Sequence, residues 1–418
     1  MRKALSSVVA VLLLSAGVCL AGDPVVSNVR AQQRGGGSKL VDIYYDVADS
    51  DGDRLTVGVA LTAGGTAIPA TSLGGAVGSG VAPGSGKQIV WDAGADWAGQ
   101  FSENVRVSVT ADDGRTGSGQ YMVIDLSGGP SASSYPVSYL SAVPSGGWSD
   151  TYKTTKLVMR RIPKGSFTMG SPSGELGRYS DETQHPVTLT KDFYIGVFEV
   201  TQRQWELVMG NRPSYFNNAT YYATRPVEQV SYYDIRENPD NSEISPNWPQ
   251  SSQVHASSFM GKLRAKTGLA TFDLPTESQW EYACRAETGT ALNSGYNLTS
   301  TGQDARMDAV GRYWYNGGSG YSQGCAPSAG TALAGSYLPN AWGLYDMHGN
   351  VWEWCLDWYG TYPGSVQDPV GAASGSSRVG RGGSWDGNAG GCRSAVRSGL
   401  WPSARISGVG FRAARTLP

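Results

Sequence analysis

The residues best suited to chemistry lie in one stretch, Asn340 to Cys355, which reads N-A-W-G-L-Y-D-M-H-G-N-V-W-E-W-C. It combines three tryptophans with the carboxylates Asp346 and Glu353. Large aromatic side chains favour burial, because each one left in water costs a few kcal/mol. Buried carboxylates in turn need hydrogen-bond donors, a countercharge or a metal. We therefore expect a buried polar site with aromatic walls.

Two common catalytic arrangements are missing from the sequence. No H-x-x-x-H or H-E-x-x-H spacing is present, and His348 is far along the chain from His185 and His255. Ser384 stands in R-G-G-S-W and not in the G-x-S-x-G pattern of a hydrolase nucleophile. These spacings disfavour a helical zinc-protease site and a serine-hydrolase triad. We expect His348 to be a packing or hydrogen-bonding residue.

The composition narrows the class of protein. A net charge of -2 provides no basic surface for nucleic acid and no polybasic patch for a membrane. The 57 glycines and the low share of charged residues, 16%, favour sheets and loops over helices. A length of 418 residues is typical of two domains.

The first 21 residues have the pattern of a secretory signal peptide. Arg2 and Lys3 precede an apolar run from Val8 to Leu14, and Cys19-Leu20-Ala21 provides a small-x-small cleavage site. The alternative is an uncleaved membrane anchor, but the apolar run is short for a span. A lipoprotein signal at Cys19 is less favoured because Val18 is bulky. The sequence predicts export to the periplasm, the cell surface or the medium, with no membrane span after cleavage.

The remaining chain divides into two predicted domains. Apolar residues alternate with polar ones around Ile43, Val57 and Val107, a period typical of antiparallel strands. Residues 22–127 are therefore predicted to form an immunoglobulin- or fibronectin-like β-sandwich. Residues 128–153, rich in Gly, Ser and Pro, are predicted to be a linker. Residues 154–418 are predicted to mix short strands with helices that start at the capping pairs Thr201/Gln204 and Thr276/Gln279.

Several motifs of the second half resemble one family. They are F-T-M-G-S at 167–171, E-V-T-Q-R-Q-W at 199–205, L-P-T-E-S-Q-W-E-Y-A-C-R at 274–285, the stretch at 340–354, R-G-G-S-W at 381–385 and G-F-R at 410–412. In this order they resemble the sulfatase-modifying-factor domain of formylglycine-generating enzymes, over residues 154–418. The resemblance implies an irregular α/β domain akin to C-type lectins. With the sandwich, the whole chain is then expected to be α+β.

The resemblance also implies an activity and a reason to doubt it. Family enzymes oxidise a cysteine of a nascent sulfatase with copper held by two cysteines that follow the R-G-G-S motif. Here the equivalent segment, 385–392, holds Cys392 alone, and Gly408 replaces a common asparagine. One thiolate cannot form a two-thiolate copper site. We expect no copper, while the pocket residues Trp352 and Ser384 are retained.

The same resemblance implies a calcium site. By position, its ligands are the side chains of Asp346 and Glu353 and the carbonyls of Gly349 and Val351. Calcium prefers carboxylate and carbonyl oxygens, which a tight turn can direct at one point. The alternative is that Asp346 and Glu353 accept backbone N–H bonds or pair with arginine.

Four cysteines remain after removal of Cys19, and an even number in an exported protein favours disulfides. Their spacing leaves three connectivities open. The family resemblance implies Cys284 with Cys392, which leaves Cys325 for Cys355. The competing interpretation is that Cys392 is a free reactive thiol.

Two functions are compatible with these features. The first is an exported, calcium-braced scaffold that binds a protein, peptide or glycan. The second is an oxidoreductase that matures sulfatases by converting cysteine to formylglycine, or a related oxidative modification. The cysteine count after Arg381 favours the first.

Overall fold

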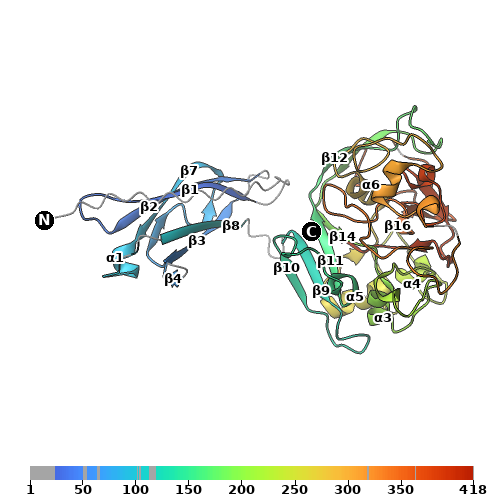
Figure 1. The fold of residues 1–418 in the computed structure, drawn as a ribbon, viewed down its shortest axis with the longest axis horizontal. Coiled ribbons are helices and arrows are strands. Elements are labelled where there is room, and N and C mark those ends of the chain that lie inside the picture. The colour runs from blue at the N-terminus through green and yellow to red at the C-terminus, as the bar shows by residue number, and fades with distance from the viewer. Residues whose placement is uncertain are drawn as a thin grey trace. The chain divides into compact units, whose positions relative to one another are not determined.

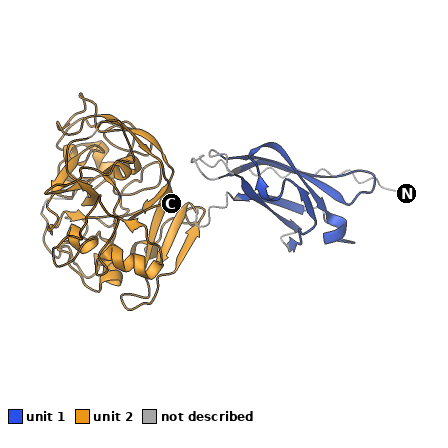
Figure 2. Cartoon of the chain, turned by 180° about the vertical axis from the view of Figure 1, so that it is seen from behind, with its two compact units in different colours: residues 1–116 blue, residues 117–418 orange. Residues whose placement is uncertain are grey.

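The computed structural model describes residues 24–49, 54–63, 66–100, 102, 105–112, 119–317, 320–362 and 364–417. The chain forms two compact units, residues 1–116 and 117–418 (Figure 2). The predicted signal peptide, 1–21, lies outside the described residues. Among those residues, no helix has the length and apolar character that a membrane crossing requires.

The first unit consists of two antiparallel sheets around one core (Figure 1). One sheet has the order β1 (Val25–Gln33), β2 (Leu40–Ala48), β7 (Gly84–Asp92), β5 (Leu73–Gly75). The other has the order β4 (Thr66–Ile68), β3 (Leu55–Ala63), β6 (Gly78–Val81), with β8 (Val105–Asp112) on β3; α1 (Ala93–Asp96) follows β7. Ile43, Val57 and Trp91 are buried between them. The predicted antiparallel strands are confirmed, and the likeness to immunoglobulin or fibronectin modules stays a prediction.

The predicted boundary at 127 and the linker 128–153 differ from the structure. β9 (Tyr121–Asp125) belongs to the second unit, where it pairs with β10 (Val137–Leu140) and β11 (Lys156–Ile162). The Gly/Ser/Pro-rich segment between β9 and β10 is held by Tyr135, which is buried and donates its hydroxyl to Leu207 O at 2.9 Å. A segment with a composition typical of linkers is therefore folded, at the edge of the largest sheet of the second unit.

The second unit contains three sheets joined by long loops (Figure 1). The largest is antiparallel, in the order β10-β9-β11-β14-β21-β15, with β14 at Phe193–Gly196, β21 at Ala414–Thr416 and β15 at Phe272–Asp273. The second has the order β12 (Gly165–Met169), β13 (His185–Leu189), β17 (Val366–Gln367). The third has the order β19 (Arg397–Leu400), β18 (Arg378–Arg381), β16 (Trp352–Trp358), β20 (Val409–Gly410).

The helices of the described residues are short and connect strands along the chain. They are α2 (Thr151–Thr154), α3 (Gln202–Met209), α4 (Tyr232–Ile235), α5 (Phe259–Thr267), α6 (Glu277–Arg285) and α7 (Ala305–Val310), with 3-10 turns η1 (Tyr222–Thr224), η2 (Trp314–Asn316) and η3 (Ala389–Cys392). The capping boxes predicted at Thr201 and Thr276 are confirmed, since each threonine accepts from the backbone N–H three residues on. Trp205 of α3 stacks on Phe259 of α5 at 5.5 Å between ring centroids.

Strand β16 contains the end of the stretch from Asn340 to Cys355. Trp354 is fully buried in the main core, and Trp342 is also buried. Trp352, at the start of the strand, is half-buried. Most of the aromatic area in the stretch is therefore core, and Trp352 alone among its tryptophans reaches toward the surface.

Candidate functional site

The two predicted pocket residues lie on either side of Gly408. The backbone N–H of Trp352 donates to Gly408 O at 2.8 Å. On the other side, a Cβ atom at position 408 would lie 3.3 Å from the Cβ of Ser384 and 3.4 Å from a carboxylate oxygen of Asp386. The Ser384 hydroxyl donates to that Asp386 carboxylate. Gly408 thus lies between the backbone of Trp352 and the side chain of Ser384.

Trp385 joins three loops around this point. Its ring contacts Phe216 at 5.1 Å and Tyr321 at 4.4 Å between centroids. Its indole Nε1 donates to Ser407 O at 3.0 Å. Two residues after Trp385, Gly387 O accepts from the N–H of Trp314 at 2.9 Å. Loops distant in sequence therefore converge on one buried tryptophan.

The edge of this arrangement leaves apolar side chains in water. Tyr321 is 45% exposed and Trp314 is 38% exposed. The C-terminal loop that supplies Ser407 also presents Ile406 at 47% and Trp401 at 72% exposure. We call the exposed Trp314, Tyr321, Trp401 and Ile406, with the buried Phe216 and Trp385 that Tyr321 contacts, the Trp385 loop surface. Exposed aromatic residues are typical of binding surfaces.

The predicted calcium loop is a tight turn whose backbone has positive φ at Asp346, Gly349 and Asn350. At position 349 glycine is required, because a Cβ atom would lie 1.9 Å from Arg312 O. Glu199 holds the turn by accepting from Asn350 Nδ2 at 2.7 Å and from Val351 N at 3.2 Å. Glu199 opens the E-V-T-Q-R-Q-W motif two residues before the α3 cap Thr201, but its hydrogen bonds to this turn were not predicted.

Glu353 has full hydrogen bonding within the protein. Arg412 donates to both of its carboxylate oxygens at 2.6 Å, and Trp280 Nε1 donates to Oε2 at 2.6 Å. This is the alternative that the sequence left open for Glu353, pairing with arginine. Calcium could use the Glu353 side chain only at the expense of one of these bonds.

Asp346 is different, since one of its oxygens has no partner. Oδ2 accepts from Gly335 N at 2.6 Å, whereas Oδ1 is buried without a hydrogen bond. Burial raises the pKa of Asp346, and burial next to Asp346 and Glu353 raises the pKa of Glu199 well above its usual range. Arg412 offsets the charge of these three buried carboxylates, and Lys153 adds positive charge near Asp346. Asp346 fits a hard cation, because an orphan carboxylate oxygen in low dielectric requires positive charge or a proton.

No group of three or more His, Cys, Asp or Glu side chains within the described parts of the chain is arranged to hold a metal. A calcium ion at this turn would accordingly depend on Asp346 and on backbone carbonyl oxygens, which are ordinary calcium ligands.

The four cysteines are free thiols in the structure, so the predicted pairs Cys284–Cys392 and Cys325–Cys355 are not formed. Cys355 is buried in β16 next to Glu353 O, whereas Cys325 lies in a loop beside Arg225. Cys284 and Cys392 both neighbour His348: Cys284 Sγ lies 4.0 Å from its Nε2, and Cys392 O accepts from its Nδ1 at 2.7 Å. The even number of cysteines predicted disulfides, and these four residues form none.

Copper does not fit the residues present. Cys392 is fully buried with its sulfur toward Ser384 O, and burial raises the pKa of its thiol to about 12. Burial also raises the pKa of the Cys284 thiol to about 12. Copper binds cysteine as thiolate, and buried protonated thiols are poor ligands. The alternative that Cys392 is a free thiol agrees with the structure, while its burial disfavours reactivity.

His348 is a structural residue, as predicted. Its ring is fully buried and accepts from Asn293 N at 3.0 Å on Nε2, so the proton on Nδ1 is the one donated to Cys392 O. Burial lowers the pKa of His348 to about 4, which keeps the ring neutral.

Fold and site together define a sheet-rich domain with few helices, a buried acidic turn and an aromatic loop surface. The model of the sulfatase-modifying factor enzyme 1-like domain matches residues 149–417, and the chain belongs to this family. The family resemblance seen in the sequence is thereby confirmed.

Two relatives and two solved structures illustrate the similarity. The chain is 32% identical over 242 residues to Chaperone protein LppX of Paenibacillus barcinonensis, covering 50% of this chain and 72% of that protein. It is 30% identical over 289 residues to the formylglycine-generating enzyme of Mus musculus, covering 62% and 75%. Treponema denticola variable protein 1 is 29% identical with a TM-score of 0.49, covering 63% and 96%. PvdO from Pseudomonas aeruginosa is 27% identical with a TM-score of 0.48, covering 62% and 94%.

Proposed function

We propose that the protein is an exported binding protein that uses a formylglycine-generating-enzyme-like domain as a scaffold and not as a copper oxidase. The Trp385 loop surface carries this proposal. It places exposed aromatic and aliphatic side chains on a rigid buried centre, which limits the entropy lost on binding. Its ligand is a protein or peptide segment with apolar side chains, because tyrosine and tryptophan anchors favour such partners.

The state of the thiols argues against the oxidase alternative. The segment after Arg381 contains Cys392 alone, and this thiol is buried and protonated at neutral pH. A chaperone among the relatives is in keeping with a binding role. Export rests on the sequence pattern of residues 1–21.

Calcium completes the proposed scaffold. We place it at the turn of Asp346, Gly349 and Val351, with Glu353 adjacent and neutralised by Arg412. The orphan Oδ1 atom of Asp346 supports this position. The ion would add positive charge next to the orphan oxygen of Asp346 and would hold the turn that precedes β16 in place.

Two experiments test the proposed function. The intact chain is incubated with copper, oxygen and a C-x-P-x-R peptide, and mass spectrometry follows the peptide cysteine. We expect no aldehyde, and its formation would overturn the proposal. A phage-displayed peptide library is then selected on the intact chain and on Trp401→Ala. Since Trp401 is 72% exposed, this variant should keep the fold but lose affinity for the selected peptides. Equal affinity for both proteins would show that the surface is not the binding site.

A further inference from the structure

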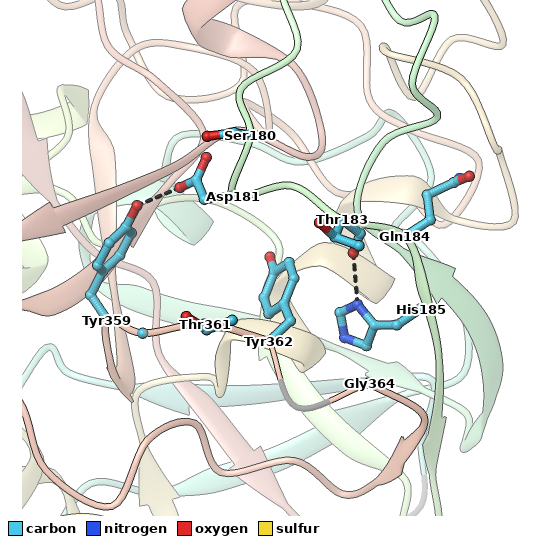
Figure 3. Close-up of a pocket in the computed structure, with 10 residues that line it drawn as sticks. Ser180, Asp181, Thr183, Gln184, His185, Tyr359, Thr361, Tyr362 and Gly364 are labelled. Atoms are coloured by element: carbon cyan, nitrogen blue, oxygen red, sulfur yellow. Dashed lines mark hydrogen bonds between the residues drawn. The ribbon is translucent and has the colours of Figure 1, made fainter.

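A second pocket lies apart from the Trp385 loop surface and shares no residue with it. One wall is the loop before β13, with Ser180, Asp181 and His185. The other wall follows β16, with Tyr359, Thr361 and Tyr362 (Figure 3). The cavity measures about 510 Å³, which is within the range of small-molecule sites. We call it the Tyr359 pocket.

The tyrosines of the pocket are held rigidly from behind. The Tyr362 ring lies between the His185 ring, 4.4 Å away between centroids, and the Arg397 guanidinium, 4.0 Å from its centroid. Its hydroxyl donates to Glu277 Oε1 at 3.1 Å. Arg397 also lies 4.7 Å from the Tyr359 centroid and pairs with Glu277 at 2.7 Å. The pocket wall is therefore preorganised, and few side chains lose conformational freedom when a ligand binds.

Asp181 faces the pocket because its neighbour is anchored inward. Glu182 is fully buried and pairs with Arg393 at 2.7 Å, while the Ser171 hydroxyl donates to it at 2.6 Å. The adjacent Asp181 carboxylate is left at the pocket surface, where it accepts from the Tyr359 hydroxyl (Figure 3). The Tyr359 hydroxyl uses one carboxylate oxygen, and the other can accept from a ligand.

His185 presents an acceptor to the same space. Its Nδ1 lies 3.0 Å from Thr183 O, a carbonyl that can only accept, so Nδ1 carries the proton (Figure 3). In the neutral ring Nε2 then has a lone pair. The pocket thus combines the acceptors of Asp181 and His185 with the hydroxyls of Ser180 and Thr361, which can both donate and accept.

These groups select the charge of the ligand. An anion would be repelled by Asp181. A cation would meet Asp181 as the single carboxylate of the lining, because Glu277 lies behind the tyrosines and is already paired with Arg397. A neutral ligand with several hydroxyl donors matches the acceptors and the apolar ring edges. We propose that the Tyr359 pocket binds a neutral saccharide of one or two rings.

Titration of the intact chain with glucose, cellobiose, maltose and N,N′-diacetylchitobiose tests this proposal, by calorimetry and by ligand-observed NMR. At least one of these sugars should bind saturably. Asp181→Ala and His185→Ala should each weaken that binding about tenfold, the effect of roughly 1.4 kcal/mol. Tyr359→Phe removes only the hydroxyl bound to Asp181 and should weaken binding less, and it remains informative if Asp181→Ala fails to fold.

Trp401→Ala is the matched control and should bind the sugar as the wild type does. This outcome separates the saccharide site from the proposed protein-binding surface, since each variant affects one ligand. Arginine methyl ester serves as a cationic probe. The proposal is overturned if none of the four sugars binds, if Asp181→Ala and Tyr359→Phe both bind with unchanged affinity, or if the cationic probe binds and the sugars do not.

Discussion

Arg412 donates two hydrogen bonds of 2.6 Å to the carboxylate of Glu353, one from Nε to Oε2 and one from Nη2 to Oε1. Both side chains are fully buried. The pair joins the segment before the last strand to β16, and it occupies the carboxylate that the sequence assigned to calcium. Its first role is therefore structural.

Arg412→Met should destabilise residues 117–418 by about 3–5 kcal/mol, because it leaves the Glu353 carboxylate buried without its countercharge. Chemical denaturation followed by fluorescence measures this loss. Arg405→Met is the control, since Arg405 pairs with Asp234 while 39% exposed and should cost about 1 kcal/mol or less. Similar losses in both variants would contradict the structural role of the buried pair.

Asp357 predicts a pH dependence of stability. Burial raises the pKa of this carboxyl to about 7, above its value of about 4 in the unfolded chain. The folded state therefore binds more protons between these values, and stability decreases as pH rises from about 4 to about 7. Asp357→Asn keeps an acceptor for Glu277 N. It should match the wild type at pH 4 and exceed it at pH 8, by on the order of 1–3 kcal/mol.

The pH dependence expected for Asp304 is the opposite of that expected for Asp357. Despite the opposing effect of burial, hydrogen bonds from Thr299, Arg306 and Ser300 lower the pKa of Asp304 to about 2. Asp304→Asn should reduce stability at pH 7, and the difference from the wild type should shrink as pH falls toward 2. Denaturation midpoints across this pH range test both aspartates, and parallel curves for the two variants would refute the assignment.

The thiols should differ in reactivity toward a disulfide reagent. In the native protein Cys325 reacts, because it is partly exposed, whereas Cys284, Cys355 and Cys392 are buried with raised pKa values. Cys325→Ser should abolish the native reaction. Denaturation without reductant should expose all four thiols, and a smaller number would show that a disulfide forms after all.

A chelator should lower the melting temperature, and added calcium should restore it. A bound ion at one hundred times its dissociation constant contributes about 2.7 kcal/mol, which corresponds to several degrees for a domain of this size. Asp346→Asn should melt at the same temperature with and without the chelator. An unchanged melting temperature of the wild type on chelation would refute calcium binding.

Local signals predicted much of the second unit. The capping boxes at Thr201 and Thr276 depend on residues three apart, and both are present. The family motifs located the core tryptophans, whereas the pocket role of Trp352 and Ser384 stays a prediction. Composition was less reliable, since the Gly/Ser/Pro-rich segment around Tyr135 is packed into the fold.

Contacts between distant parts of the chain were beyond sequence reasoning. Glu199 meets Asn350 across 151 residues, and Asp181 meets Tyr359 across 178. Neither pair has a motif that links its members, and the loops that join them follow no hydrophobic period. Which carboxylates become buried or face a pocket is decided by tertiary packing, as the neighbours Asp181 and Glu182 illustrate.

Strand β21 lies inside the largest sheet, between β14 and β15, although it consists of Ala414–Thr416 near the end of the chain. The sheet consequently cannot close during synthesis until these last residues are available. β14 and β15 must wait with unpaired backbone edges, which is a state prone to aggregation. Folding of this unit therefore waits for a segment that follows β15 far along the chain.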